Sequence, residues 1–313
     1  MIQAAIIGLG AIGQRLIKNF TSHPEIKVTA ICDQNEEIAY ETSKRLNGVS
    51  FFTDYLTMLE EADIDLVYIA VPPKFHYKIA SDVIAKNKHV LCEKPLANSV
   101  EEAESLYILA KEKGIIHAMN LPLNYSSGSK TFASLIKEGY VGRVRRLVLK
   151  MHFSEWPRPW QQNDWIASRE QGGFVLEVGV HYIQQIQKIF GEVNVLNKIV
   201  QYPEDPNACE VGILAQLELE DGTPILIDGL SQIAGNEEIR FTAYGTDGTL
   251  SLLNWSELEG GKLGEPVQRI EANSFLENSL LNELVKAMKG EKAEIIDFHE
   301  GYKAQVVLEQ LRG

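Results

Sequence analysis

The sequence Ala4-Ala-Ile-Ile-Gly8-Leu-Gly10-Ala-Ile-Gly13 decides how the first part of this chain folds. The four apolar residues before Gly8 predict a buried strand. Beyond Gly13, apolar residues return at helical spacing, so a helix is predicted to follow the loop. In such a strand–loop–helix unit, Gly8 permits the tight turn, Gly10 lets the backbone approach a ligand closely, and Gly13 lets helix and strand pack together.

A G-x-G-x-x-G loop in this context is typical of dinucleotide-binding folds. The first helical residues, Ala11 and Ile12, would offer backbone N–H groups and a partial positive charge to a pyrophosphate. Asp33 ends the next predicted strand, 20 residues after Gly13. An acid there accepts hydrogen bonds from a ribose 2′-hydroxyl and repels a 2′-phosphate, so NAD is favoured, with NADP possible. The alternative for Asp33 is an ordinary acidic turn residue.

The first third of the chain alternates strand and helix patterns, which predicts a parallel sheet covered on both faces. Its strands are predicted at residues 4–7, 27–32, 65–71, 89–92 and 115–119. Later strand-like stretches follow one another without helices, which predicts a mostly antiparallel sheet. These lie at residues 144–153, 193–201, 211–220, 224–233, 239–244 and 249–253.

The predicted fold class is therefore α/β plus α+β. Residues 1–120 are expected to form a doubly wound Rossmann domain that binds NAD(P). Residues 121–313 are expected to form an α+β domain for substrate binding and oligomerisation, whose open sheet is flanked by helices. The last predicted helix, at residues 299–311, is expected to pack back on the first domain.

The charge balance argues against several classes of partner. Lys and Arg number 30 against 43 Asp and Glu, a net charge of −13. Such a chain repels phosphate on average, so neither nucleic acid nor a membrane surface is expected as a partner. Three scattered cysteines predict neither disulfides nor a zinc cluster, and no apolar run is long enough to span a bilayer. A cytoplasmic location is expected.

The sequence Glu93-Lys94-Pro95 follows the predicted strand at residues 89–92. In an open parallel sheet, the carboxyl ends of the strands border the ligand crevice. Pro95 restricts Lys94 to extended geometry, which would direct the ammonium group to one place, and the peptide bond between them can be cis. A solvated surface lysine is the alternative.

With this motif the chain resembles the glucose–fructose oxidoreductase/inositol dehydrogenase (Gfo/Idh/MocA) family. The resemblance rests on four stretches, which lie in the family's order along the whole chain. They are the loop at residues 8–13, Val71-Pro72-Pro73 with His76, Glu93-Lys94-Pro95, and Gly172-Gly-Phe-Val-Leu-Glu177-Val-Gly-Val-His181.

The resemblance implies an NAD(P)-dependent dehydrogenase or reductase that acts on CH–OH groups of a sugar, cyclitol or related polyol. It implies catalytic roles for Lys94 and His181, with Glu177 beside His181 at helical i, i+4 spacing. Histidine suits proton exchange near neutral pH, so His181 is given the role of the base and Lys94 that of polarising the reacting oxygen. Residues expected to contact the cofactor are Gly8, Gly10, Ala11, Ile12, Gly13, Asp33, Val71, Pro72, His76, Glu93 and Lys94.

The resemblance also implies a homodimer or homotetramer. No metal site is expected, because Glu177 and His181 supply only two ligands. A core histidine bonded to Glu177 is the alternative for His181, and a helix-capping histidine for His76. Aromatic residues and arginines near Trp156 and Arg169 fit either sugar binding or a packed loop.

Three departures from the family pattern motivate a second hypothesis, a dinucleotide-binding regulator without turnover. Glu177 stands where the family usually has Asp, and Gln184 where a further acid is common. The segment Asn120-Leu-Pro-Leu-Asn-Tyr125 lacks the family's usual arginine. Fold alone does not establish chemistry, so both hypotheses remain open at this point.

Overall fold

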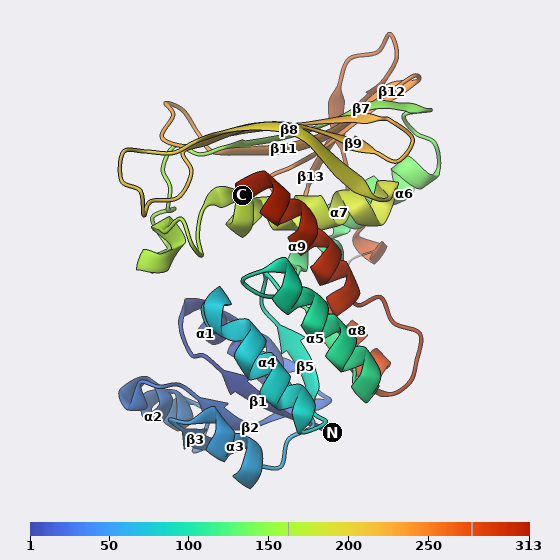
Figure 1. Cartoon of the computed structure of the whole chain (residues 1–313). Coiled ribbons are helices and arrows are strands. Elements are labelled where there is room, and N and C mark those ends of the chain that lie inside the picture. The colour runs from blue at the N-terminus through green and yellow to red at the C-terminus, as the bar shows by residue number, and fades with distance from the viewer. Residues whose placement is uncertain (162, 277) are drawn as a thin grey trace. The chain divides into compact units, whose positions relative to one another are not determined.

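The structure is a computed structural model that describes residues 1–161, 163–276 and 278–313. It divides into two compact units (Figure 1). The first unit consists of Met1–Leu121 and Ser279–Gln305, and the second of Pro122–Asn278 and Val306–Gly313. Each unit has its own sheet and its own buried apolar residues.

The first unit is built on a parallel sheet with the strand order β3-β2-β1-β4-β5-β6. Residues 4–7 of β1 and all of β4 are buried, as expected for strands covered on both faces. β1 pairs with β2 on one side and β4 on the other, so the order of the strands reverses there. The strands are β1 (Ile2–Ile7), β2 (Ile26–Cys32), β3 (Ser50–Phe52), β4 (Leu66–Ile69), β5 (His89–Cys92) and β6 (His117–Met119).

Helices connect these strands along the chain, and several of them begin at side-chain caps. Ser99 Oγ accepts a hydrogen bond from Glu102 N at 3.2 Å, and Gly114 ends the same helix in the left-handed region with φ 63°. The helices of the first unit are α1 (Ala11–Ser22), α2 (Glu36–Arg45), α3 (Tyr55–Glu61), α4 (His76–Ala85), α5 (Val100–Lys113), α8 (Leu280–Met288) and the first part of α9 (Phe298–Arg312).

The second unit is built on a sheet with the order β14-β13-β12-β11-β7-β10-β9-β8. Its neighbouring strands are antiparallel except for β7 and β10, which pair in parallel. The predicted fold class, a parallel sheet followed by a mostly antiparallel one, is confirmed. The strands are β7 (Val144–His152), β8 (Val193–Gln201), β9 (Gly212–Leu219), β10 (Pro224–Leu230), β11 (Glu238–Gly245), β12 (Gly248–Leu253), β13 (Glu257–Lys262) and β14 (Gln268–Ile270).

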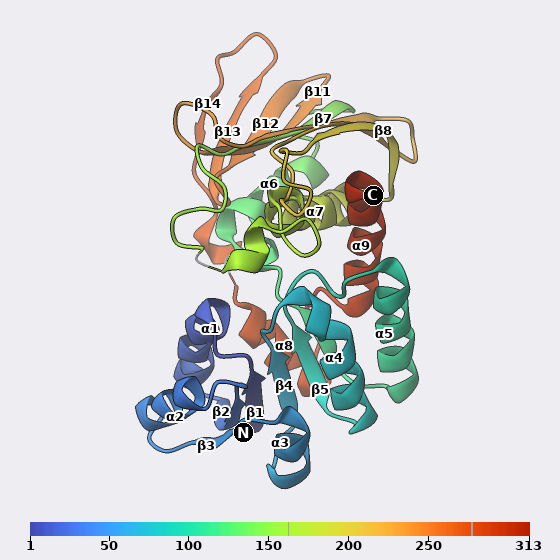
Figure 2. The same ribbon diagram turned by 60° about the vertical axis from the view of Figure 1, so that its left-hand side comes forward.

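One face of this second sheet is covered by α6 (Ser127–Lys137) and α7 (Val180–Phe190), as both ribbon views show (Figures 1 and 2). Alternate residues of the strands point toward these helices and are buried. Phe241 of β11 lies at the centre, with ring centroids 5.2 Å from Phe132 and 6.2 Å from Phe190. These contacts form the apolar core of the second unit.

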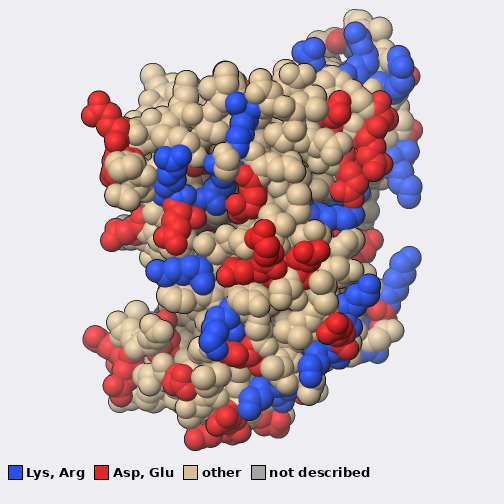
Figure 3. All heavy atoms as spheres, viewed as in Figure 1, with Lys and Arg blue, Asp and Glu red and all other residues tan. Residues whose placement is uncertain are grey.

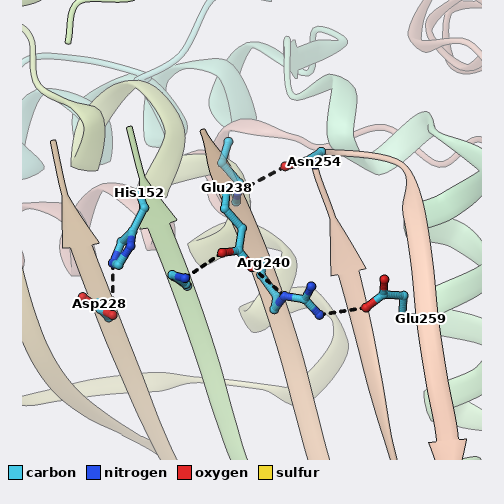
Figure 4. A network of polar contacts seen from close by, with 8 residues as sticks. His152, Asp228, Glu238, Arg240, Asn254 and Glu259 are labelled. Carbon is cyan, nitrogen blue, oxygen red and sulfur yellow. Dashed lines mark hydrogen bonds and ion pairs between the residues drawn. The ribbon is translucent and has the colours of Figure 1, made fainter. Parts of the chain in front are cut away.

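The other face of the second sheet carries a network of charges (Figure 4). Glu238 accepts hydrogen bonds from Lys150 at 2.6 Å and from Arg240 at 2.8 Å, and Arg240 also reaches Glu259 at 2.9 Å. His152 and Asp228 lie 3.1 Å apart on neighbouring strands. The first set of contacts joins side chains of β7, β11 and β13, and the second joins β7 to β10, so charged contacts extend over much of the outer face.

Acidic and basic side chains are intermixed on the face of the molecule shown in Figure 3. Within the part of the chain that the structure describes, helices long and apolar enough to cross a bilayer are absent.

Candidate active site

The glycine loop lies directly after β1, and each of its three glycines meets a different steric condition. Gly8 has φ +91°, a conformation that L side chains rarely adopt. A Cβ on Gly13 would lie 2.0 Å from the Gly8 carbonyl oxygen, so only glycine lets α1 come this close to the loop. At Gly10, by contrast, a Cβ would meet no heavy atom within 4 Å. Gly10 therefore borders open space at the N-terminus of α1, which fits a loop that receives a phosphate group.

Asp33 follows β2 and is tied to the glycine loop. Its Oδ2 accepts a hydrogen bond from Leu9 N at 2.8 Å, and its Oδ1 accepts one from Asn35 N at 2.9 Å. The two bonds hold the carboxylate in one orientation beside the loop. A carboxylate has about four acceptor positions, so the group retains capacity for a ribose hydroxyl.

His76 connects the segments that follow β4 and β5. Its ring is fully buried, with Nδ1 2.7 Å from the Pro95 carbonyl oxygen and Nε2 2.8 Å from that of Val71. Burial lowers the pKa of His76, and the two carbonyl oxygens act against that shift. Because the ring is enclosed, His76 would affect a ligand indirectly, by holding in place the segments that carry Val71, Pro72 and Pro95.

Glu93 and Lys94 follow β5 and have different surroundings. Glu93 is buried, and its Oε1 accepts hydrogen bonds from Tyr68 Oη and Asn120 Nδ2, both at 2.5 Å. Burial raises the pKa of Glu93. Lys94 is half-buried, and its peptide bond to Pro95 is cis. Glu93 thus anchors the end of β5, while the neighbouring Lys94 retains an accessible part.

In the second unit, a buried carboxylate anchors the segment that carries Glu177. Glu210 Oε1 accepts a hydrogen bond from Val175 N at 2.8 Å, and burial raises the pKa of this acid. Gly173 has φ +96°, and a Cβ there would lie 2.1 Å from Glu210 Oε2. The chain then forms a π-helical turn, Val175–Gly179, which contains Glu177 and leads into α7. Wide turns of this kind are frequent at functional sites.

His181 lies in the first turn of α7 and is buried. Its ring meets the indole of Trp255 nearly at right angles, with centroids 5.0 Å apart and an interplanar angle of 82°. One turn further, Gln184 Oε1 accepts a hydrogen bond from Asn124 Nδ2 at 2.7 Å. Gln184, one departure from the family pattern, therefore contacts a residue of the segment 120–125, which is another.

The loop that precedes Gly172 and contains Trp156 and Arg169, here called the aromatic loop, is partly packed against the rest of the second unit. Trp156 is buried, with ring centroids 5.0 Å from Phe153 and 5.9 Å from Phe174. The Arg169 guanidinium lies 3.6 Å from the centre of the Tyr202 ring. For Trp156 the structure supports the packed-loop interpretation.

The structure gathers the residues expected at the cofactor at one edge of the first sheet, because parallel strands end on the same side. Lys94 lies in this first unit, and Glu177 and His181 lie in the second. Glu210 was not predicted from the sequence, although an acid between Cys209 and Val211 in an apolar stretch indicates a buried carboxylate. Trp255, which stands in an Asn-Trp turn where a hairpin usually has Asn-Gly, was not predicted either.

Comparisons with known proteins identify the family. A family model described as "Oxidoreductase family, NAD-binding Rossmann fold" matches residues 2–121, and the model of the GFO/IDH/MocA C-terminal domain matches residues 130–251. Together they cover well over half of the chain, with one model for each part.

Individual relatives agree with these matches. An uncharacterized oxidoreductase of Bacillus subtilis, YrbE, is 24% identical over 260 residues, which are 81% of this chain and 74% of that protein. A dTDP-3,4-didehydro-2,6-dideoxy-alpha-D-glucose 3-reductase of Streptomyces violaceoruber is 27% identical over 273 residues, 86% of this chain and 76% of that one. A solved complex of levoglucosan dehydrogenase with NADH and levoglucosan has the same fold, with a TM-score of 0.86, 19% identity, and coverage of 99% and 96% of the two chains. The chain belongs to the Gfo/Idh/MocA family of oxidoreductases, and its N-terminal domain is the NAD-binding Rossmann domain of that family.

Proposed function

We propose that this protein is an NAD-dependent oxidoreductase that interconverts a hydroxyl and a carbonyl group on a sugar or cyclitol. The observation that carries the proposal lies in the first unit, where the glycine loop, Asp33 and Lys94 share the carboxyl edge of one parallel sheet. The relatives named for dTDP-sugar reduction and for levoglucosan oxidation support a sugar as the substrate class.

The chain's residues suit the binding of a dinucleotide. N–H groups at the start of α1, including those of Ala11 and Ile12, would hold the pyrophosphate above Gly10. The Asp33 carboxylate would accept hydrogen bonds from the ribose. When bound, the nicotinamide ring supplies the acceptor or donor of hydride.

We assign the proton chemistry to Lys94 and His181. The Lys94 ammonium donates a hydrogen bond to the reacting oxygen and stabilises negative charge on it. The His181 imidazole takes the hydroxyl proton when the alcohol is oxidised and returns it when the carbonyl is reduced. Glu177 acts through His181 by orienting the imidazole and favouring its charged form.

A direct test is to follow NADH absorbance while purified protein and NAD are mixed with a panel of sugars, anhydrosugars and inositols. Turnover of at least one member is expected. Tight NAD binding without turnover on any member would instead favour the regulator hypothesis, which the departures at Glu177, Gln184 and residues 120–125 motivate. The hydrogen bond between Asn124 and Gln184 weakens the case for the regulator, because it gives Gln184 a structural role that does not require the loss of activity.

Replacing Asp33 with Asn is expected to weaken the preference for NAD over NADP. The substitution removes a negative charge that would repel a 2′-phosphate, while the amide oxygen can still accept from Leu9 N. The ratio of kcat/KM for NAD to that for NADP should fall about tenfold or more. Asp63→Asn, at an exposed position, is the control and should leave the ratio unchanged. An unaltered ratio in Asp33→Asn would remove Asp33 from the ribose site.

We further propose that a second copy of the chain covers the outer face of the second sheet. Ile199, Leu214 and Leu226 are 59%, 55% and 37% exposed on the adjacent strands β8, β9 and β10. Apolar side chains exposed together are costly in water, and a twofold partner would bury these three beside the charged residues of the same face.

Light scattering is expected to give a dimer or tetramer at micromolar concentration. Leu214→Glu should shift the protein toward the monomer, whereas Leu263→Glu, on an 82% exposed turn residue, should not. A species of 35.0 kDa for the unmodified chain would contradict the proposal.

A further inference from the structure

We propose that Trp255 forms a stacking platform beside His181, and that the platform selects substrates in which the polyol is a closed ring. The inference rests on the proposed function and adds to it the shape of the substrate. It is carried by the backbone conformation of Trp255, by its ring contacts and by its partial exposure.

Trp255 occupies an unusual place in a hairpin. It lies in the three-residue turn between β12 and β13, which contains a hydrogen bond from Ser256 N to Leu253 O at 3.0 Å. Asn254 has φ 43° and Trp255 has φ 78°, both in the left-handed region. Asn is common in this region, but a bulky Trp is rare there and its backbone is strained. Backbone strain of this kind is found most often at functional sites.

Neighbouring segments of the same chain hold this turn in its strained conformation. Ser126 Oγ donates a hydrogen bond to the Trp255 carbonyl oxygen at 3.2 Å, and Ile239 N donates one to Asn254 Oδ1 at 3.2 Å. Gly128 is required for the approach, because a Cβ there would lie 2.0 Å from the Ser256 carbonyl oxygen. The turn is therefore fixed from several sides.

Trp255 is in contact with other rings and yet is not fully buried. Its centroid lies 5.0 Å from that of His181 and 5.6 Å from that of Tyr182, yet the residue is only half-buried. The other well-packed tryptophan discussed above, Trp156, is buried, as expected of a residue that only fills the core. Trp255 thus combines a fixed backbone position with partial exposure, and its ring contacts that of the proposed base.

An aromatic face binds the C–H face of a sugar or cyclitol ring through apolar contact. A closed ring presents that face in a fixed shape, whereas an acyclic polyol must lose conformational freedom to do so. A platform beside His181 would thus hold a ring with one hydroxyl group near the imidazole. Cyclic polyols are expected to bind better than their open-chain counterparts.

The activity test compares D-glucose and myo-inositol with the acyclic polyol D-glucitol, using the unmodified protein, Trp255→Leu and Trp255→Phe. For a cyclic substrate, Trp255→Leu should raise KM about tenfold with little change in kcat, and Trp255→Phe should retain most of the affinity. Phe275→Leu, at a 96% exposed position outside the aromatic loop, is the control and should behave like the unmodified protein. Equal use of cyclic and acyclic polyols, or an unchanged KM in Trp255→Leu, would overturn the inference while leaving the proposed function intact.

A second readout does not depend on turnover. Tryptophan fluorescence of the NAD-loaded protein should change on addition of D-glucose or myo-inositol. The change should disappear in Trp255→Phe but persist in Phe275→Leu. If no sugar is oxidised, the proposed function fails and this measurement decides the inference alone. A missing change in the unmodified protein, or one that persists in Trp255→Phe, overturns it.

Discussion

Replacing Lys94 with alanine is expected to lower kcat by roughly 10²–10⁴-fold, and His181→Ala should have an effect of the same size. Lys94→Ala removes the donor to the reacting oxygen, and His181→Ala removes the group that exchanges the proton. The measurement is the steady-state rate of NADH formation on a substrate that the unmodified protein oxidises.

Two control variants remove a lysine and a histidine that lie outside the proposed site. Lys78→Ala removes a lysine whose side chain is 69% exposed and paired with Asp82, and His23→Ala removes a ring that contacts Asn282. Both should keep kcat close to that of the unmodified protein. Near-normal kcat in Lys94→Ala and in His181→Ala would refute the proposed roles of both residues.

The second large effect is expected at Gly13. In Gly13→Ala the new Cβ would lie 2.0 Å from the Gly8 carbonyl oxygen, so the loop must move away from α1. A strain of about 1–3 kcal/mol is usual for such overpacking. Both the midpoint of thermal unfolding and the affinity for NAD should fall, the affinity by about 10–100-fold.

Gly10→Ala, in the same loop, is expected to weaken NAD binding without lowering the stability of the apo protein. Gly10 has φ −68° and ψ −169°, which alanine adopts readily, and a Cβ there meets no heavy atom within 4 Å. The apo protein should therefore keep its unfolding midpoint, while the methyl group obstructs the phosphate and weakens NAD binding. Calorimetry with and without NAD measures both quantities. Unchanged NAD affinity in Gly10→Ala would place the pyrophosphate elsewhere.

The sequence predicted the first sheet well, because long apolar runs bounded by Gly8 and Asp33 are local signals. It missed the strand Ser50–Phe52 and the helix Tyr55–Glu61, which are too short to show a clear period. It also missed β13, where two glycines interrupt the strand pattern. The parallel pairing of β7 with β10 joins segments far apart in sequence, and a local pattern carries no information about such a pairing.

In the candidate site, too, residues within sequence motifs could be predicted, whereas contacts between distant segments could not. The resemblance to the family, carried by motifs such as Glu93-Lys94-Pro95 and the stretch from Gly172 to His181, singled out Lys94 and His181. It could not find Glu210, whose role depends on the close approach to Gly173, nor the ring contact between Trp255 and His181. Those relations arise only when distant segments fold together.

The first unit includes a late segment of the chain, Ser279–Gln305. Within that unit the Ile296 carbonyl oxygen accepts a hydrogen bond from Met119 N at 2.7 Å, and Phe298 N donates to His117 Nδ1 at 3.1 Å. Both bonds close the outer edge of β6. During translation, the nascent chain therefore exposes an unfinished sheet edge until its last helices leave the ribosome, an interval in which edge-to-edge aggregation is possible.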